Sequence, residues 1–325
     1  MQFAGSHILS VQQFERADVE RIFAVADRMG PYARQRRVTR VLDGAILGSM
    51  FFEPSTRTRV SFGSAFNLLG GEVRETTGFE NSAIAKGESL YDTARVLSGY
   101  SDVIAMRHPV AGSVAEFAAA SRVPVINGGD GSNEHPSQAL LDLYTIKSEL
   151  VERGRGIDQL RIAMVGDLRY GRTVHSLSKL LCLFERVQVT LVSPGELRMP
   201  GEIVAEMRQS GIEVIESDAL EASISHVDIV YSTRIQEERF SSQAEADLYR
   251  GRYRLNQAIY THHCEPNTVI MHPLPRDSRD NARELDDDLN DNPNLAIFRQ
   301  TDNGMLVRMA LFALTLDVVD QVDKH

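Results

Sequence analysis

The amino-acid sequence predicts an α/β protein of two doubly wound domains, each a parallel sheet covered by helices on both faces. Short apolar runs alternate with segments of helical period along the chain, which is typical of such sheets. A polar stretch with two glycines, residues 149–159, interrupts the alternation, and 325 residues accommodate two domains of ordinary size. We expect similar domains at 1–150 and 151–325, a site in the cleft between them, and a last helix that can pack back on the first domain.

Strands and helices alternate through the first half of the chain. Residues 45–52 form an apolar run of the length of a buried strand, and apolar side chains then recur at helical spacing up to Leu69. Residues 81–87 have no clear period and are expected to form a loop. The same criteria place strands at 45–52, 71–74, 102–106 and 123–127, and helices at 14–26, 55–69, 88–100, 113–121 and from 135 onward.

The second half repeats the alternation without a detectable sequence repeat. Strands are expected at 161–166, 187–192, 213–215, 227–231 and 268–271, and helices at 172–184, 201–209 and 303–318. The acidic segment 284–288 is expected to be exposed, because adjacent carboxylates are costly to bury.

Composition argues against several classes of function. A net charge of −10 disfavours a nucleic-acid surface, and no apolar run approaches the length of a membrane span. The two cysteines, Cys182 and Cys264, are too few for a disulfide framework or a zinc site. We therefore expect a cytoplasmic protein that needs no metal or other cofactor and binds neither nucleic acid nor a membrane.

The stretch 51–59 is the strongest candidate for an anion site. Pro54 and Ser55 lie where a buried strand passes into a helix, so three hydroxyls (Ser55, Thr56 and Thr58) and the Arg57 guanidinium gather on the first helical turn. The N–H groups and the dipole of that turn suit a phosphate, and arginine adds a fork of donors. The alternative is a well-capped helix that carries a surface arginine.

Other cationic or donor groups follow the ends of neighbouring strands. Arg107 and His135 each come just after a predicted strand, as Arg57 does, and parallel strands present their carboxyl ends at one rim. At a helix N-terminus His135 would favour its neutral form and donate an N–H to a carbonyl oxygen. A purely structural role for His135 stays open.

The second half offers two further arginines. The stretch from Gly166 to Thr173 resembles a phosphate-binding Walker A loop, but Arg172 replaces its lysine, which argues against nucleotide hydrolysis. Arg172 and Arg234, each after a strand, suit the two carboxylates of a small dicarboxylate. Residues 262–264 (His-His-Cys) are expected to form a polar loop, and His175 and His272 to be packing groups or groups that support the site residues. No nucleophile motif stands out, so we expect catalysis by positioning and electrostatics without a covalent intermediate.

Four motifs together resemble the transcarbamoylase family: Ser-Thr-Arg-Thr-Arg at 55–59, Met-Arg-His-Pro at 106–109, His-Pro-Ser-Gln at 135–138 and His-Pro-Leu-Pro at 272–275. The resemblance covers nearly the whole chain. Residues 166–176 and 233–236 are similar to the aspartate-specific members, the catalytic chains of aspartate carbamoyltransferases. Ornithine-specific members carry a cysteine where this chain has Pro273, and Arg234 would repel an ammonium group.

The resemblance implies a role for each matched residue. Arg57, Thr58, Lys86, Arg107 and His135 would be catalytic. Carbamoyl phosphate would be bound in the first domain by Ser55, Thr56, Arg57, Thr58, Ser82, Lys86, Arg107, His135 and Gln138. Aspartate would be bound in the second by Arg172, Arg234, Gln236, Leu274 and Pro275, together with Lys86. Ala85 stands where some members have a second lysine, and we expect activity to survive this change.

The resemblance also implies an activity and an assembly. The expected reaction transfers the carbamoyl group to aspartate in pyrimidine biosynthesis, in a homotrimer to whose shared sites a neighbouring subunit contributes Ser82 and Lys86. Regulatory chains or a dihydroorotase-like partner are compatible with the sequence. The alternatives are a carbamoyltransferase for another amine acceptor and a non-catalytic relative.

Overall fold

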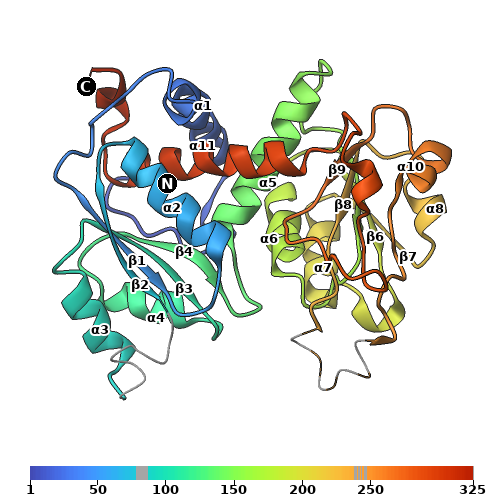
Figure 1. The fold of residues 1–325 in the computed structure, drawn as a ribbon, viewed down its shortest axis with the longest axis horizontal. Helices are drawn as coiled ribbons and strands as arrows, with labels where there is room; N and C mark the ends of the chain where they lie inside the picture. Colours follow the sequence, from blue (N-terminus) through green and yellow to red (C-terminus); the bar gives the residue numbers. More distant parts are fainter. Residues whose placement is uncertain (78–86, 238–239, 241, 243, 245–246, 325) are drawn as a thin grey trace. The chain divides into compact units, whose positions relative to one another are not determined.

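The computed structural model describes residues 1–77, 87–237, 240, 242, 244 and 247–324 (Figure 1). Contacts within the chain divide it into two compact units, the first made of Met1–Leu141 and Asp302–His325 and the second of Asp142–Thr301. The division falls inside two helices, α5 (Pro136–Val151) and α11 (Ile297–Thr315), so each of them contributes to both units.

The first unit is built on a four-stranded parallel sheet. Its strands lie in the order β2-β1-β3-β4, and the in-register pairing of β1 with β3 places Phe51 beside Arg107. The strands are β1 (Ile46–Phe51), β2 (Glu72–Thr77), β3 (Val103–His108) and β4 (Val125–Asp130). The helices are η1 (Val11–Gln13), α1 (Arg16–Ala33), α2 (Thr56–Leu68), α3 (Leu90–Leu97), α4 (Ser113–Ala120) and η6 (Val319–Lys324), with parts of α5 and α11.

Helices cover both faces of this sheet. Figure 1 shows α1, α2 and α11 on one face and α3 and α4 on the other. On the first face Phe62 and Phe66 of α2 pack edge-on against Phe312 of α11, at 5.9 and 4.9 Å between ring centroids. On the second face Phe117 of α4 joins a buried cluster with Met106 of β3. Burial on both faces explains why the central strands β1 and β3 are largely apolar, whereas the edge strand β2 exposes Glu72, Arg74 and Glu75.

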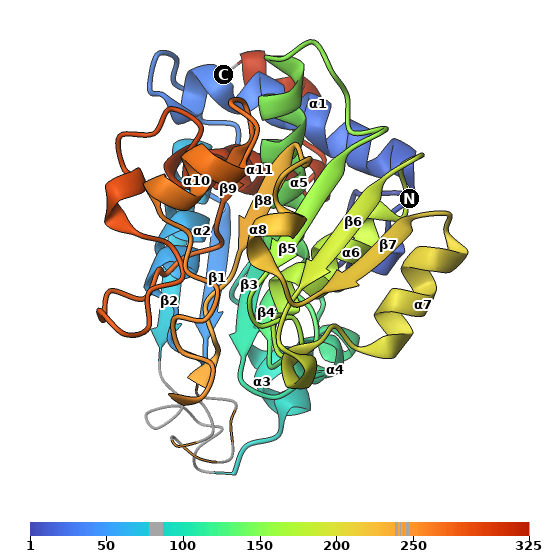
Figure 2. The ribbon, with the colours of Figure 1, turned by 90° about the vertical axis from the view of Figure 1, so that its right-hand side faces the viewer.

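The second unit contains a five-stranded parallel sheet in the order β7-β6-β5-β8-β9. Figure 2 shows this sheet with α8 lying over its near face, and Figure 1 shows α6 and α7 on the opposite face. The strands are β5 (Arg161–Val165), β6 (Gln188–Val192), β7 (Glu213–Ser217), β8 (Ile229–Ser232) and β9 (Val269–Met271). The helices are α6 (Arg172–Leu181), η3 (Gly195–Leu197), α7 (Gly201–Gln209), α8 (Leu220–Ser223), α10 (Gln257–His263) and η5 (Asp287–Leu289).

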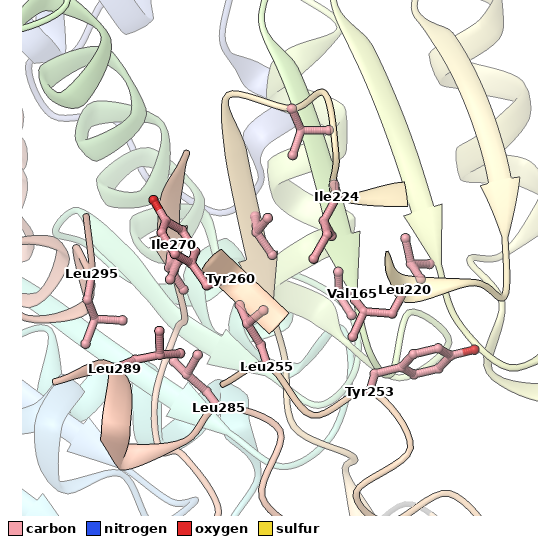
Figure 3. Close-up of a cluster of buried hydrophobic side chains, with 14 of the residues drawn as sticks. Val165, Leu220, Ile224, Tyr253, Leu255, Tyr260, Ile270, Leu285, Leu289 and Leu295 are labelled. Carbon is pink, nitrogen blue, oxygen red and sulfur yellow. The ribbon is translucent and has the colours of Figure 1, made fainter. Parts of the chain in front are cut away.

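The core on the α8 and α10 face is drawn in Figure 3. Val165 and Ile270 from the strands meet Ile224, Tyr260 and Leu285 from the covering segments, and all of these side chains are buried. Leu285 belongs to the acidic segment 284–288, so that segment contributes an apolar side chain to the core.

The predicted α/β class with two parallel sheets is confirmed. Three local predictions were wrong, and the third, at residues 262–264, is described with the candidate site. The last helix begins at Ile297, not near residue 303, and three residues of the segment 284–288 are buried: Glu284, Leu285 and Asp286. Glu284 lies 2.8 Å from His272, and Asp286 accepts a hydrogen bond from Arg254, so polar partners offset the cost of burying both carboxylates. Within the described part of the chain, no helix is both long and apolar enough to cross a membrane.

Asp228 lies at the edge of the second sheet where the strands begin, directly before β8. Its side chain is 9% exposed. It accepts hydrogen bonds from the two terminal nitrogens of the Arg155 guanidinium and from the backbone and side chain of Arg161, the first residue of β5. Burial alone would raise the pKa of Asp228, but these donors outweigh it and hold that pKa below its ordinary value.

We expect Asp228→Asn to lower the free energy of unfolding by about 1–2 kcal/mol at neutral pH, a value limited by the partial exposure of both arginines. Because the folded pKa is depressed, the stabilisation is present above the unfolded pKa and is lost as pH falls through the folded pKa. The difference between wild type and variant should therefore be constant from pH 6 to 8 and shrink below about pH 4. Denaturant titrations across this pH range measure it, and a difference that persists at low pH would contradict the assignment.

Candidate active site

The predicted anion-binding residues of the first unit lie at the carboxyl end of β1. Ser55 occupies the N-cap position of α2, and its hydroxyl makes no capping hydrogen bond to the helix. Thr58 is buried, Ser55 is partly buried, and Thr56 and Arg57 are exposed. Hydroxyls, a guanidinium and the positive end of a thirteen-residue helix therefore gather on one turn, as a bound phosphate requires.

Arg107 comes from the carboxyl end of the adjacent strand, β3. Its Nε donates to Glu53 at 2.8 Å, and its guanidinium also reaches the carbonyl oxygen of Gly128 at 3.4 Å. The Arg107 side chain is only 13% exposed and that of Glu53 21%. Glu53 thus balances the charge of Arg107 and fixes the direction of a guanidinium that is largely screened from water.

His135 is held by a loop that Asp130 organises. Asp130 is 1% exposed and accepts hydrogen bonds from the Glu134 and Gly112 backbones and from the side chains of Asn127 and Asn133. These bonds fix the chain between the end of β4 and the start of α5. Sequence reasoning missed Asp130, although its place between glycines in a loop that opens a helix was a usable signal.

His135 and Gln138 lie at the start of α5. His135 is 3% exposed, with its Nδ1 3.5 Å from the Ser137 hydroxyl, while Gln138 is partly buried and its backbone N–H donates to the His135 carbonyl. The structure therefore places residues 55–58 after β1, Arg107 within the last two residues of β3, and His135 and Gln138 after β4. All of them belong to the carboxyl edge of one sheet.

In the second unit a buried carboxylate joins two loops. Asp167, 0% exposed, accepts from the backbone N–H of Tyr170 at 3.0 Å and from that of Gln236 at 3.1 Å. The Gln236 side chain in turn donates to the Tyr170 carbonyl at 2.8 Å. Arg172 opens α6 directly after the first loop, and Arg234 lies in the second loop, so Asp167 ties together the segments that carry both arginines.

Gly166 permits these two loops to approach. It has φ +119°, and a Cβ at this position would lie 2.2 Å from the Thr233 carbonyl oxygen. We expect Gly166→Ala to push the Thr233 segment away, to destabilise the protein by about 3 kcal/mol, and to weaken aspartate binding.

Gly201→Ala is the matched control for Gly166→Ala. Gly201 lies at the first position of α7, where an added Cβ meets nothing within 4 Å, so we expect stability to change by less than about 0.5 kcal/mol. Thermal unfolding and aspartate titration of both variants make the comparison. Equal behaviour of the two variants would show that the contact with Thr233 does not matter.

Leu274 and Pro275 follow the carboxyl end of β9. Leu274 has a left-handed backbone (φ +58°), and its N–H donates to His272 Nδ1 at 2.9 Å. His272 is 1% exposed, with its Nε2 2.8 Å from Glu284. His272 therefore shapes the backbone of Leu274, and His175, which bonds the Leu168 carbonyl at 2.7 Å, fixes the loop before Arg172. Both histidines are buried and support neighbouring loops through their ring nitrogens.

Glu237, directly after Gln236, was not identified from the sequence. Arg250 donates two hydrogen bonds of 2.6 and 2.7 Å to its carboxylate, and Arg279 donates two more. We call this arrangement of Glu237, Arg250 and Arg279 the Glu237 clamp. The Glu237 side chain is 15% exposed. This clamp connects the loop of Arg234 to the segment after Pro275, so the aspartate-binding segments proposed from the sequence support one another.

Comparison with known proteins finds a matching family model for each half of the chain. Residues 6–148 match the family model described as aspartate/ornithine carbamoyltransferase, carbamoyl-P binding domain, and residues 158–315 match the model of the Asp/Orn binding domain. The chain belongs to the aspartate/ornithine carbamoyltransferase family. The residues predicted to bind phosphate fall within the first match, and Arg172, Arg234, Gln236, Leu274 and Pro275 fall within the second.

The similar carbamoyltransferases include close relatives over the full length of the chain. An aspartate carbamoyltransferase catalytic subunit from Saccharophagus degradans is 78% identical over 324 residues, which covers 100% of this chain and 96% of the relative. One from Cellvibrio japonicus is 76% identical over 325 residues, with coverage of 100% and 96%.

Solved structures of carbamoyltransferases share the fold. Aspartate transcarbamoylase from Trypanosoma cruzi, in complex with carbamoyl phosphate and aspartate, has a TM-score of 0.88 at 38% identity, covering 97% of this chain and 98% of that one. The catalytic subunit of the Methanocaldococcus jannaschii enzyme has a TM-score of 0.85 at 42% identity, with coverage of 98% and 100%.

Some of the predicted carbamoyltransferase residues cannot be placed. Ser82 and Lys86 lie outside the described residues, so their roles stay predictions. The prediction of a polar loop at 262–264 was wrong, because His262 and His263 are the last two residues of α10 and Cys264 is its C-cap. His262 Nδ1 bonds the Ala258 carbonyl at 2.7 Å. Among the described residues no group of three or more His, Cys, Asp or Glu side chains is arranged to hold a metal ion.

Proposed function

We propose that this chain transfers the carbamoyl group of carbamoyl phosphate to the amine of L-aspartate, giving N-carbamoyl-L-aspartate and phosphate. The observation that carries the choice of acceptor is the arginine pair, Arg172 and Arg234, in the segment that matches the Asp/Orn binding model. Two guanidiniums at the carboxyl edge of one sheet suit two carboxylates and repel the side-chain ammonium of ornithine.

Carbamoyl phosphate is the substrate of the first unit in this proposal. Ser55, Thr56 and Arg57 bind the phosphate at the N-terminus of α2, with Ser82 and Lys86 as further ligands. The carbonyl oxygen is bound by Thr58, Arg107 and His135, and the amide group by Gln138. Arg107 is well suited to this role, because Glu53 orients it and low exposure strengthens its electrostatic effect.

The reaction proceeds by direct attack. The aspartate amine forms a bond to the carbonyl carbon, negative charge develops on the oxygen, and Arg107, His135 and Thr58 stabilise that charge. The bond from carbon to the phosphate oxygen then breaks, and the leaving phosphate takes the proton of the amine. No covalent intermediate with the protein forms.

Aspartate is held by Arg172, Arg234 and Gln236, and its pocket is completed by Leu274, Pro275 and Lys86. Asp167 and the Glu237 clamp hold these loops in one arrangement. The experiment that tests the choice of acceptor is a steady-state assay of the purified chain with carbamoyl phosphate and either L-aspartate or L-ornithine. We expect carbamoyl aspartate without citrulline. Citrulline as the main product would overturn the roles given to the two arginines.

We also propose that the chain acts in pyrimidine biosynthesis, in the cytoplasm, as a homotrimer whose sites are completed by Ser82 and Lys86 of a neighbouring subunit. Family resemblance supports this assembly. Lys86→Ala and Arg57→Ala trimers, each inactive alone, should recover activity when subunits are exchanged, because some sites then receive both intact residues. Mixed trimers, verified by mass, that remain inactive would contradict shared sites. Regulatory chains or a dihydroorotase-like partner are compatible with this trimer.

A further inference from the structure

Asp142 is a fully buried carboxylate to which the proposed mechanism gives no role. It lies on α5 and is 0% exposed. Its Oδ1 accepts a hydrogen bond from Gln300 Nε2 and its Oδ2 one from the Tyr231 hydroxyl, each at 2.6 Å. All three residues belong to the second unit. A buried carboxylate is costly unless donors compensate its charge, so its partners are held firmly in place.

One branch of this network reaches the Leu274 segment. Gln300, 1% exposed, uses its amide oxygen to accept from the backbone N–H of His272 at 3.0 Å. His272 Nδ1 in turn accepts from the Leu274 N–H at 2.9 Å. A continuous series of hydrogen bonds therefore runs from Asp142 through Gln300 and His272 to Leu274, whose left-handed backbone depends on being held.

The other branch reaches the arginine segments. Tyr231 is the third of the four residues of β8, which leads into Thr233 and Arg234, and its hydroxyl also shares a hydrogen bond with Thr173, the residue after Arg172. Burial, followed by the Asp142 charge and hydrogen bond, raises the pKa of Tyr231 well above its ordinary value. Tyr231 therefore stays a protonated donor over the range in which an enzyme works.

We infer that Asp142 is a positioning residue for the acceptor, because it sets the relative placement of the three segments that carry Arg172, Arg234 and Leu274. It touches neither substrate and acts through Tyr231 and Gln300. This inference rests on the proposed function. It predicts that disturbing Asp142 impairs the use of aspartate much more than the use of carbamoyl phosphate.

Asp142→Asn tests the inference with almost no change of volume. Asparagine has one acceptor oxygen, so one of the two donors, Tyr231 or Gln300, must face its NH2 group. If the Gln300 amide rotates so that its oxygen faces the new NH2 group, its own NH2 group faces the His272 N–H, and two donors again oppose each other. We expect the KM for aspartate to rise about tenfold or more and the KM for carbamoyl phosphate to change less than about twofold, because a buried hydrogen bond is lost on the aspartate side alone.

The double variant Asp142→Asn with Gln300→Glu should rescue the defect. The new asparagine amide then donates to one oxygen of the new glutamate and accepts from Tyr231, while the other glutamate oxygen accepts from the His272 N–H, so every donor again has an acceptor. Gln300→Glu alone places two carboxylates together and should be impaired. We expect the KM of the double variant to return to within about threefold of wild type, as expected for coupled neighbours.

Thr268→Val is the control for a merely structural effect. Thr268 is 1% exposed, and its hydroxyl donates to the Val227 carbonyl at 2.9 Å, so the variant loses a buried hydrogen bond outside this network. It should lower the unfolding temperature without raising the KM for aspartate. An Asp142→Asn enzyme that is less stable but has an unchanged KM for aspartate, or a double variant that recovers nothing, would overturn the inference. A wild-type chain that forms no carbamoyl aspartate would instead refute the proposed function.

Discussion

Replacing Arg57 by alanine should lower kcat/KM by about 10³-fold or more while the fold remains intact. Arg57 is exposed on the first turn of α2, so the core loses nothing. The loss is catalytic because a guanidinium that binds the departing phosphate neutralises charge that grows as the carbon–oxygen bond breaks. Steady-state kinetics with both substrates measure the effect, and circular dichroism checks the fold.

The neighbouring Arg59 provides the control for Arg57→Ala. Arg59 forms an ion pair with Glu75 of β2, and both side chains are partly exposed. Arg59→Ala should therefore cost up to about 1 kcal/mol of stability and leave kcat/KM within about threefold. If the two alanine variants lost activity to the same extent, the phosphate would not be bound specifically by Arg57.

Replacing Arg172 by alanine should lower kcat/KM for aspartate by about 100-fold, with little change in the binding of carbamoyl phosphate. Arg172 opens α6, and its loop is fixed by Asp167 and by His175, so the guanidinium is presented from a rigid support. Loss of a charge-assisted, bidentate contact to a carboxylate accounts for an effect of this size. Aspartate saturation curves at fixed carbamoyl phosphate measure it.

Arg169, three residues earlier in the same loop, is the control for Arg172→Ala. It is exposed, stacks over the Tyr170 ring at 5.1 Å and donates to the Glu196 carbonyl at 3.3 Å. Its removal should change kcat/KM by less than about threefold. Comparable losses in the two variants would indicate a general effect of positive charge in this loop, not recognition of a carboxylate by Arg172.

Much of the fold could be predicted because its signals are local. The run from Ala45 to Phe52 is apolar except for Ser49, since β1 is covered on both faces, and the residues that follow it begin α2 as expected. The same logic placed Arg107, Arg172 and Arg234 after strands. Parallel strands present these ends at one edge, so a linear pattern was enough to group candidate residues within each unit.

The errors arose where the signal is not local. Residues 306–315 of α11 are all buried, whereas its first turns expose Arg299, Thr301 and Asp302. The apolar residues therefore marked only the later part of the helix, and its start was placed too late. Segment 284–288 looked like a solvated acidic run because the partners of Glu284 and Asp286, His272 and Arg254, are distant in sequence. Several of the residues that support the site also have partners that are distant in sequence, so they were not predicted.

Asp142 and Tyr231 illustrate this limit most clearly. A carboxylate inside a helix and a tyrosine inside a strand have no common sequence signature, and only the folded unit places their oxygens 2.6 Å apart. Residues that could contact substrate therefore have a signature at strand ends, whereas the residues that hold them are found by tertiary structure.

The most direct test of the account follows the transferred carbon itself. The purified chain is incubated with carbamoyl phosphate labelled with ¹³C in the carbonyl and with ¹⁵N-labelled L-aspartate, and the products are examined by NMR. The account predicts a ureido carbon coupled to the aspartate nitrogen, formed in equal amount with phosphate. The Arg57→Ala variant should form it more slowly by about 10³-fold or more. Label that accumulates as bicarbonate, or phosphate released without a carbon–nitrogen coupling, would contradict it.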